Sequence, residues 1–101
     1  MARLDVYARP SRDRRGYVLD VQVGPLAGLA TRTFVLLLPE QDLPKPIRDL
    51  NPIFAVRGER HVMVTQTIAT IPTRDLGQAV ASLDTDHDKV TRALDVLLLG
   101  Y

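Results

Sequence analysis

Apolar and polar residues alternate along the first two-thirds of the chain, which is the pattern of half-buried β-strands. Residues 4–8 and 17–23 alternate in this way on either side of a charged turn at residues 10–16, and this arrangement predicts an antiparallel hairpin. An uncharged loop follows at residues 24–30. Residues 33–38 are apolar on both faces, as expected of a central strand.

The middle of the chain is interrupted by proline. Residues 39–52 are predicted to run over the surface rather than form a regular strand or a long helix, because proline fixes φ and lacks a donor; the four prolines are Pro39, Pro44, Pro46 and Pro52. Residues 53–56 and 61–65 then predict a second hairpin with Gly58 in its turn, and residues 67–71 predict a further short strand closed by Pro72.

The end of the chain has the period of a helix. Asp84 or Thr85 supplies the predicted N-cap, after an ambiguous segment at residues 78–83. One apolar stripe is expected to face the core: Val90, Ala93, Leu94, Leu97 and Leu98. Leu99 falls roughly opposite that stripe and is expected to project from a polar face. Many short strands followed by one helix predict a small antiparallel barrel or bent sheet with the helix packed on it.

Composition narrows the class of protein. The 101 residues correspond to one domain, residues 1–101, and 13 basic against 12 acidic residues argue against a general nucleic-acid binder. The absence of cysteine excludes disulfides and thiolate metal sites. The N-terminus lacks the apolar core of a signal peptide, and the longest apolar run, residues 34–38, is far too short to span a membrane. A cytoplasmic protein is therefore expected.

Candidate chemistry is sparse. The two histidines, His61 and His87, lie in different predicted elements without metal-ligand spacing, so neither a metal nor another cofactor is expected. No nucleophile with a placed base occurs. The apolar chain end at Leu98 and Leu99 is the clearest candidate surface, and it is either covered by a second copy of the chain or offered to another partner.

A resemblance gives these patterns a context. Residues 18–22 (Val-Leu-Asp-Val-Gln) and 50–52 (Leu-Asn-Pro) carry it most strongly, and the chain ends with a glycine and one further residue after the helix. Further support comes from Thr65, Ala69, Pro72, Gly77, Val80, Ala81, Leu83 and Ala93. On these residues the chain resembles, nearly end to end, the CcdB-type toxins of plasmid and chromosomal toxin–antitoxin modules.

The resemblance implies a mainly β fold, an SH3-like antiparallel barrel with a C-terminal helix, that forms a homodimer and is not an enzyme. Such toxins bind the breakage-reunion subunit of DNA gyrase and trap its cleaved complex with DNA. A CcdA-type antitoxin neutralises them through a disordered C-terminal segment. The toxin–antitoxin complex represses its own operon, so that the toxin meets operator DNA only through the antitoxin, and plasmid modules of this kind serve plasmid maintenance.

The resemblance also implies particular site residues. The gyrase contact of the family, its C-terminal end and the loop after the second strand, corresponds here to Asp95, Leu98, Leu99, Gly100, Tyr101, Pro25 and Leu26. Well-studied members carry a tryptophan at the position of Leu99, stacked on arginines of gyrase, and leucine makes no cation–π contact. Lys45 and Arg48, in the proline-rich segment, are the candidates for antitoxin binding.

Two alternatives remain open. MazF-type endoribonucleases share the implied barrel, and such an enzyme would use a set such as Arg60, His61 and Thr65 for acid–base chemistry. A degenerate homologue would bind its antitoxin and leave gyrase unaffected.

Overall fold

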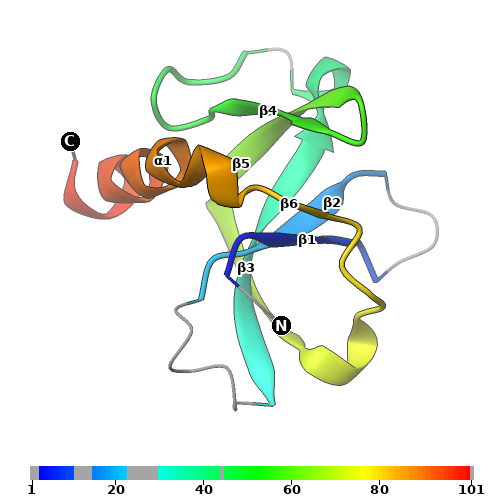
Figure 1. The fold of residues 1–101 in the computed structure, drawn as a ribbon. Helices are drawn as coiled ribbons and strands as arrows, with labels where there is room; N and C mark the ends of the chain where they lie inside the picture. Colours follow the sequence, from blue (N-terminus) through cyan, green and yellow to red (C-terminus); the bar gives the residue numbers. More distant parts are fainter. Residues whose placement is uncertain (1–2, 11–14, 23–29, 44, 101) are drawn as a thin grey trace.

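A single antiparallel sheet, curved into a nearly closed barrel, makes up most of the molecule (Figure 1). The computed structural model describes residues 3–10, 15–22, 30–43 and 45–100. Six strands pair in the order β4-β5-β3-β2-β1-β6. Their bounds are β1 Asp5–Ala8, β2 Tyr17–Asp20, β3 Thr31–Pro39, β4 Ile53–Val56, β5 Glu59–Pro72 and β6 Ala81–Ser82. One α-helix, α1 His87–Leu99, follows the strands and completes the predicted barrel-plus-helix fold.

The interior of the barrel holds the larger of two apolar clusters. Residues from five strands and from α1 contribute to it, among them Val6, Leu19, Leu37, Met63 and Val90. A smaller cluster on the other face of the sheet joins Tyr7, Val18 and Phe34, with the Tyr7 and Phe34 rings edge-to-face at 6.0 Å. Both faces of β2 are therefore covered, although its alternating sequence predicts one polar face.

The two predicted hairpins are present. β1 pairs with β2, and β4 pairs with β5 through a loop of only two residues between Val56 and Glu59. Arg57 and Gly58 both have positive φ, 52° and 83°, which is the type I′ geometry that matches the twist of a β-hairpin. The prediction that Gly58 lies in this turn is confirmed.

The prediction of two strands at 61–65 and 67–71 is wrong. β5 is one continuous strand of 14 residues, because its backbone stays extended through Gln66. Its pairing with β3 shifts instead: Val35 lies opposite Ile68, whereas the next residue, Leu36, lies opposite Val64. This bulge bends the long strand at the point where the sequence pattern changes phase.

Two expectations for the helix are also wrong. Neither Asp84 nor Thr85 is its N-cap, because a 3-10 turn at Asp84–Asp86 precedes it and α1 begins at His87. Leu98 is not part of the buried stripe, since it is 70% exposed. Val90 and Ala93 are fully buried, whereas Leu98 and Leu99 in the last turn of α1 are exposed; this end of the helix points away from the sheet (Figure 1).

The remaining segments agree with their sequence patterns. Of the proline-rich stretch, residues 40–42 form a short 3-10 helix and residues 45–49 are exposed, as expected of a surface excursion. The ambiguous stretch at 78–83 contains β6, which pairs with β1 through Asp5–Ser82 and Val6–Ala81. Another short 3-10 helix, Thr73–Asp75, follows β5.

Candidate functional site

The last described residues form an exposed apolar end, here called the C-terminal tip: Leu98, Leu99 and Gly100. Leu98 is 70% exposed and Leu99 59%. The exposure predicted for Leu99 from its helical phase is confirmed. Two adjacent leucines are thus exposed on a helix whose middle is buried, which makes the tip a candidate contact surface.

Gly100 ends the helix in a way that requires glycine. Its φ is +83°, in the left-handed region, and its N–H donates to the carbonyl of Val96 at 3.1 Å. This closes the last turn of α1 and fixes the direction in which the chain leaves it. Three residues expected at this site, Tyr101, Pro25 and Leu26, lie outside the described residues. Asp95 is exposed one turn before the tip.

The polar side of α1 contacts β4 and the segment that precedes it. Arg92 Nε lies 3.4 Å from Asp49 Oδ1. The Lys89 ammonium donates to the carbonyl of Ile53 at 2.9 Å and lies 4.7 Å from the centre of the Phe54 ring. These contacts and the buried side of the helix together fix the orientation of α1, and therefore of the tip.

Lys45 and Arg48 are exposed on that same segment. The segment is anchored by Asn51, whose buried amide nitrogen donates to the Met63 carbonyl at 3.0 Å and to Gln66 Oε1 at 2.8 Å. Asn51 Oδ1 accepts the Ile47 N–H at 2.9 Å. The Leu-Asn-Pro sequence at residues 50–52 is thus a structural anchor for the segment that carries these two exposed cations.

A buried ion pair, which no sequence pattern indicated, lies where the chain leaves β2. Arg32 Nε and Asp20 Oδ2 are 2.5 Å apart, both side chains are fully buried, and a second guanidinium nitrogen donates to Asp20 Oδ1 at 3.1 Å. The same nitrogen donates to the Gln22 carbonyl at 3.2 Å, and Gln22 Oε1 accepts the Thr33 N–H at 3.0 Å. This network fixes the chain on both sides of residues 23–29.

The three residues of the endoribonuclease alternative do not converge. The Thr65 hydroxyl is buried and donates to the carbonyl of Leu50. His61 is also buried; its Nδ1 donates to the Glu59 carbonyl at 3.0 Å and its ring lies edge-on to Tyr17. Arg60 points into solvent and forms two hydrogen bonds to Glu40, at 3.0 and 2.9 Å, which lower the pKa of the Glu40 carboxyl.

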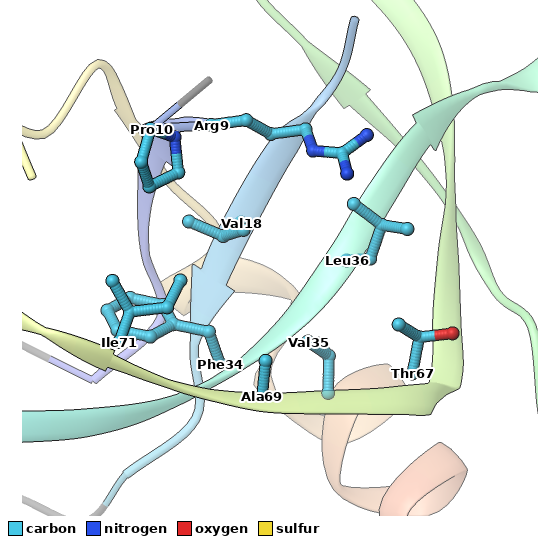
Figure 2. Close-up of a pocket in the computed structure, with 9 residues that line it drawn as sticks. All are labelled: Arg9, Pro10, Val18, Phe34, Val35, Leu36, Thr67, Ala69 and Ile71. Carbon is cyan, nitrogen blue, oxygen red and sulfur yellow. The ribbon is translucent and has the colours of Figure 1, made fainter. Parts of the chain in front are cut away.

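A cavity of about 160 Å³ opens on the other face of the sheet (Figure 2). Its lining is aliphatic and aromatic apart from Arg9 and Thr67 at the rim; the other lining residues are Pro10, Val18, Phe34, Val35, Leu36, Ala69 and Ile71. Neither carboxylate nor imidazole lines it among the described residues, so the cavity fits an apolar side chain better than a reacting substrate.

Neither a metal site nor a membrane span is found within the part of the chain that the structure describes. No three His, Cys, Asp or Glu side chains there lie close enough to hold a metal ion. No helix there combines the length and the apolar character needed to cross a bilayer.

Comparisons with known proteins agree with the fold. The family model described as CcdB protein matches residues 3–100. A solved structure of an endoribonuclease in complex with its cognate antitoxin, from Mycobacterial species, superposes with a TM-score of 0.77 at 17% identity. That match covers 99% of this chain and 95% of the other, and at this identity it shows a shared fold. No curated protein matches the chain in sequence.

Proposed function

The chain belongs to the CcdB family and is the toxin of a toxin–antitoxin system, and we propose that it binds the breakage-reunion subunit of DNA gyrase and traps the cleaved complex. The observation that carries this proposal is the C-terminal tip. Leu98 and Leu99 are exposed on a helix that is fixed on both sides and capped by Gly100. A pre-oriented apolar end binds a partner without first ordering itself, which reduces the entropic cost of association.

The second partner is a CcdA-type antitoxin. Lys45 and Arg48 are exposed on a segment held by Asn51, and they suit an acidic, disordered segment of the antitoxin. The similar solved structure is itself a complex of a toxin with its cognate antitoxin, which supports a partner of this kind. The toxin–antitoxin pair, rather than this chain alone, would then bind operator DNA and repress the operon.

We propose binding, and not catalysis, as the mode of action. An acid–base pair must reach a substrate within hydrogen-bond distance. Here the His61 ring is buried, the Thr65 hydroxyl is occupied by a backbone carbonyl, and Arg60 is paired with Glu40. The family's homodimeric state is part of the proposal, since two tips on one particle would engage the symmetric gyrase dimer.

The decisive experiment measures supercoiling inhibition and cleavage-complex trapping by gyrase with purified protein. The wild-type chain is expected to trap the complex at micromolar concentration. Leu99→Asp should abolish trapping, because it places a charge in an apolar contact, and Leu99→Trp should strengthen it at least several-fold by restoring a ring for cation–π contact. Ile47→Asp is the matched control, because Ile47 is an aliphatic residue of similar exposure that lies in the segment before β4 and not in α1.

The alternatives give different results in the same preparation. A folded wild-type chain that binds antitoxin but traps nothing would contradict gyrase poisoning and identify a degenerate homologue. Cleavage of a long RNA that disappears in His61→Ala would instead establish the endoribonuclease.

A further inference from the structure

The cavity of Figure 2 lies at the bulge where β5 bends away from β3. Val35 lies opposite Ile68, and the next residue, Leu36, lies opposite Val64. The three residues of β5 between Val64 and Ile68 therefore have no counterpart on β3, and the extra length bends the strand. Val35 and Leu36 on one strand and Thr67 on the other line the resulting space. The cavity is thus a consequence of the strand register.

The size and lining of the cavity select the apolar part of an occupant. Its volume is about 160 Å³, which is similar to the roughly 150 Å³ of an engineered apolar cavity that binds benzene. Phe34 and Val35, both fully buried, form the lining together with Val18, Ala69 and Ile71. These side chains offer dispersion contacts to an aromatic ring or a branched chain of about six carbons, and they offer no partner to a polar group.

A positive charge at the rim selects the polar part of the occupant. Arg9 is the one charged residue in the lining formed by the described parts of the chain. Its Nη1 donates to the Arg15 carbonyl at 3.1 Å, which holds the guanidinium beside the cavity (Figure 2). A carboxylate is the anion that matches the planar guanidinium group. An ammonium group would meet no carboxylate in this described lining, so amines and zwitterionic amino acids fit less well.

We propose that the cavity binds a small organic monocarboxylate, with its aromatic or branched aliphatic body against the apolar lining and its carboxylate paired with Arg9. A ring-sized space with one adjacent charge is complete for a molecule of this size. The ligand is bound and not converted, since the described lining contains no general acid or base. The tip residues Leu98, Leu99 and Gly100 are not part of the lining, so this site is separate from the proposed gyrase contact.

A ¹H–¹⁵N NMR titration with sodium benzoate tests the site. The wild-type protein is expected to bind saturably, with the largest shift changes at the amides of Val18, Leu36 and Ala69. Ala69→Leu fills the cavity and should weaken binding by at least about tenfold. Ala55→Leu makes the same change at an exposed alanine of β4 that does not line the cavity, and it should bind like the wild type. Thr67→Leu replaces Ala69→Leu if that variant does not fold.

Benzyl alcohol, which has the same ring without the charge, tests the role of Arg9. It should bind the wild type several-fold more weakly than benzoate does. Arg9→Gln should weaken benzoate binding to the level of benzyl alcohol and leave benzyl alcohol binding unchanged. Arg57→Gln, at an exposed arginine in the β4–β5 turn, should alter neither.

Two sets of results would contradict the proposal at different points. Equal affinity for the two ligands, or unchanged benzoate binding in Arg9→Gln, would overturn the carboxylate as the recognised group. No saturable binding by about 10 mM benzoate, or undiminished binding in Ala69→Leu, would overturn the site itself. Neither set bears on gyrase trapping, which is measured separately and depends on the C-terminal tip.

Discussion

Arg32 and Asp20 form a buried ion pair in which each side chain neutralises the charge of the other. Both are fully buried, and either one alone would leave an uncompensated charge inside the protein. Arg32→Met should lower the free energy of unfolding by about 3–5 kcal/mol, as expected for one half of a buried pair. The double variant Asp20→Leu/Arg32→Met should recover a large part of that loss. Urea titration of the three proteins measures both values, and a single variant as stable as the wild type would contradict the assignment.

Ionisation of Tyr7 is expected to make the stability of the protein depend on pH. Burial, followed by the negative charge of Asp5, raises the pKa of its phenol above the ordinary value of 10.0. Because the folded pKa exceeds the unfolded one, this contribution to stability is complete below pH 10 and is lost as the pH rises through the folded value. Tyr7→Phe should therefore alter the dependence of stability on pH only in the alkaline range. Thermal melts between about pH 8 and pH 12 test this, and identical profiles for both proteins would refute it.

Some residues of the candidate site were accessible from sequence and others were not. Leu99 was found because helical phase depends only on neighbours along the chain. Leu98 was misassigned because phase does not reveal where the underlying sheet stops. The Asp20–Arg32 pair and the Asn51 anchor each join positions 12 or more residues apart, so their partners are defined only by the register of the folded sheet.

Among the elements, the turn of the β4–β5 hairpin allows a specific prediction about stability. Gly58 has a φ of +83° with open space around its Cα, so Gly58→Ala introduces backbone strain without a clash. It should lower stability by about 1 kcal/mol. Gly77 is equally open but has no positive φ, and Gly77→Ala should be neutral or stabilising by about 0.5 kcal/mol. Chemical denaturation of both variants checks the contrast, and equal effects would exclude strain at Gly58.

Elements with local signals were predicted well. Both hairpins follow from turn residues flanked by alternating strands, and the middle of α1 from its period. The ends of elements were predicted poorly, because the β5 bulge and the 3-10 turn before α1 depend on how β5 packs against β3 and how the chain crosses the barrel. At the ends of elements the local sequence pattern is weak, so tertiary contacts determine where a strand or helix begins and ends.

For the whole molecule, the net charge predicts how strongly the protein binds DNA. The net charge of +1 gives the chain little of the electrostatic attraction on which nonspecific DNA binding depends. The protein alone should not shift its promoter DNA in a gel at physiological salt, whereas the complex with its antitoxin should. A shift by the toxin alone, with a steep salt dependence, would contradict this division of roles.

The fold class followed from the order of predicted elements, since strands followed by one helix leave few compact arrangements. The order of the strands in the sheet did not follow from the sequence pattern. β6 is only two residues long, and it pairs with β1, which lies far away along the chain. No local signal in residues 78–83 indicates that partner, because so short a strand exists only through its neighbour.

That pairing has a consequence for protein synthesis. β1 leaves the ribosome long before its partner β6, and the interior that covers Val6 and Leu19 also requires Leu83, Val90 and Ala93. A ribosome stalled anywhere before these codons releases a chain that has no closed core and no C-terminal tip. The core can therefore close only after residues 83–93 have been synthesised, and shorter fragments lack the surface that is proposed to bind gyrase.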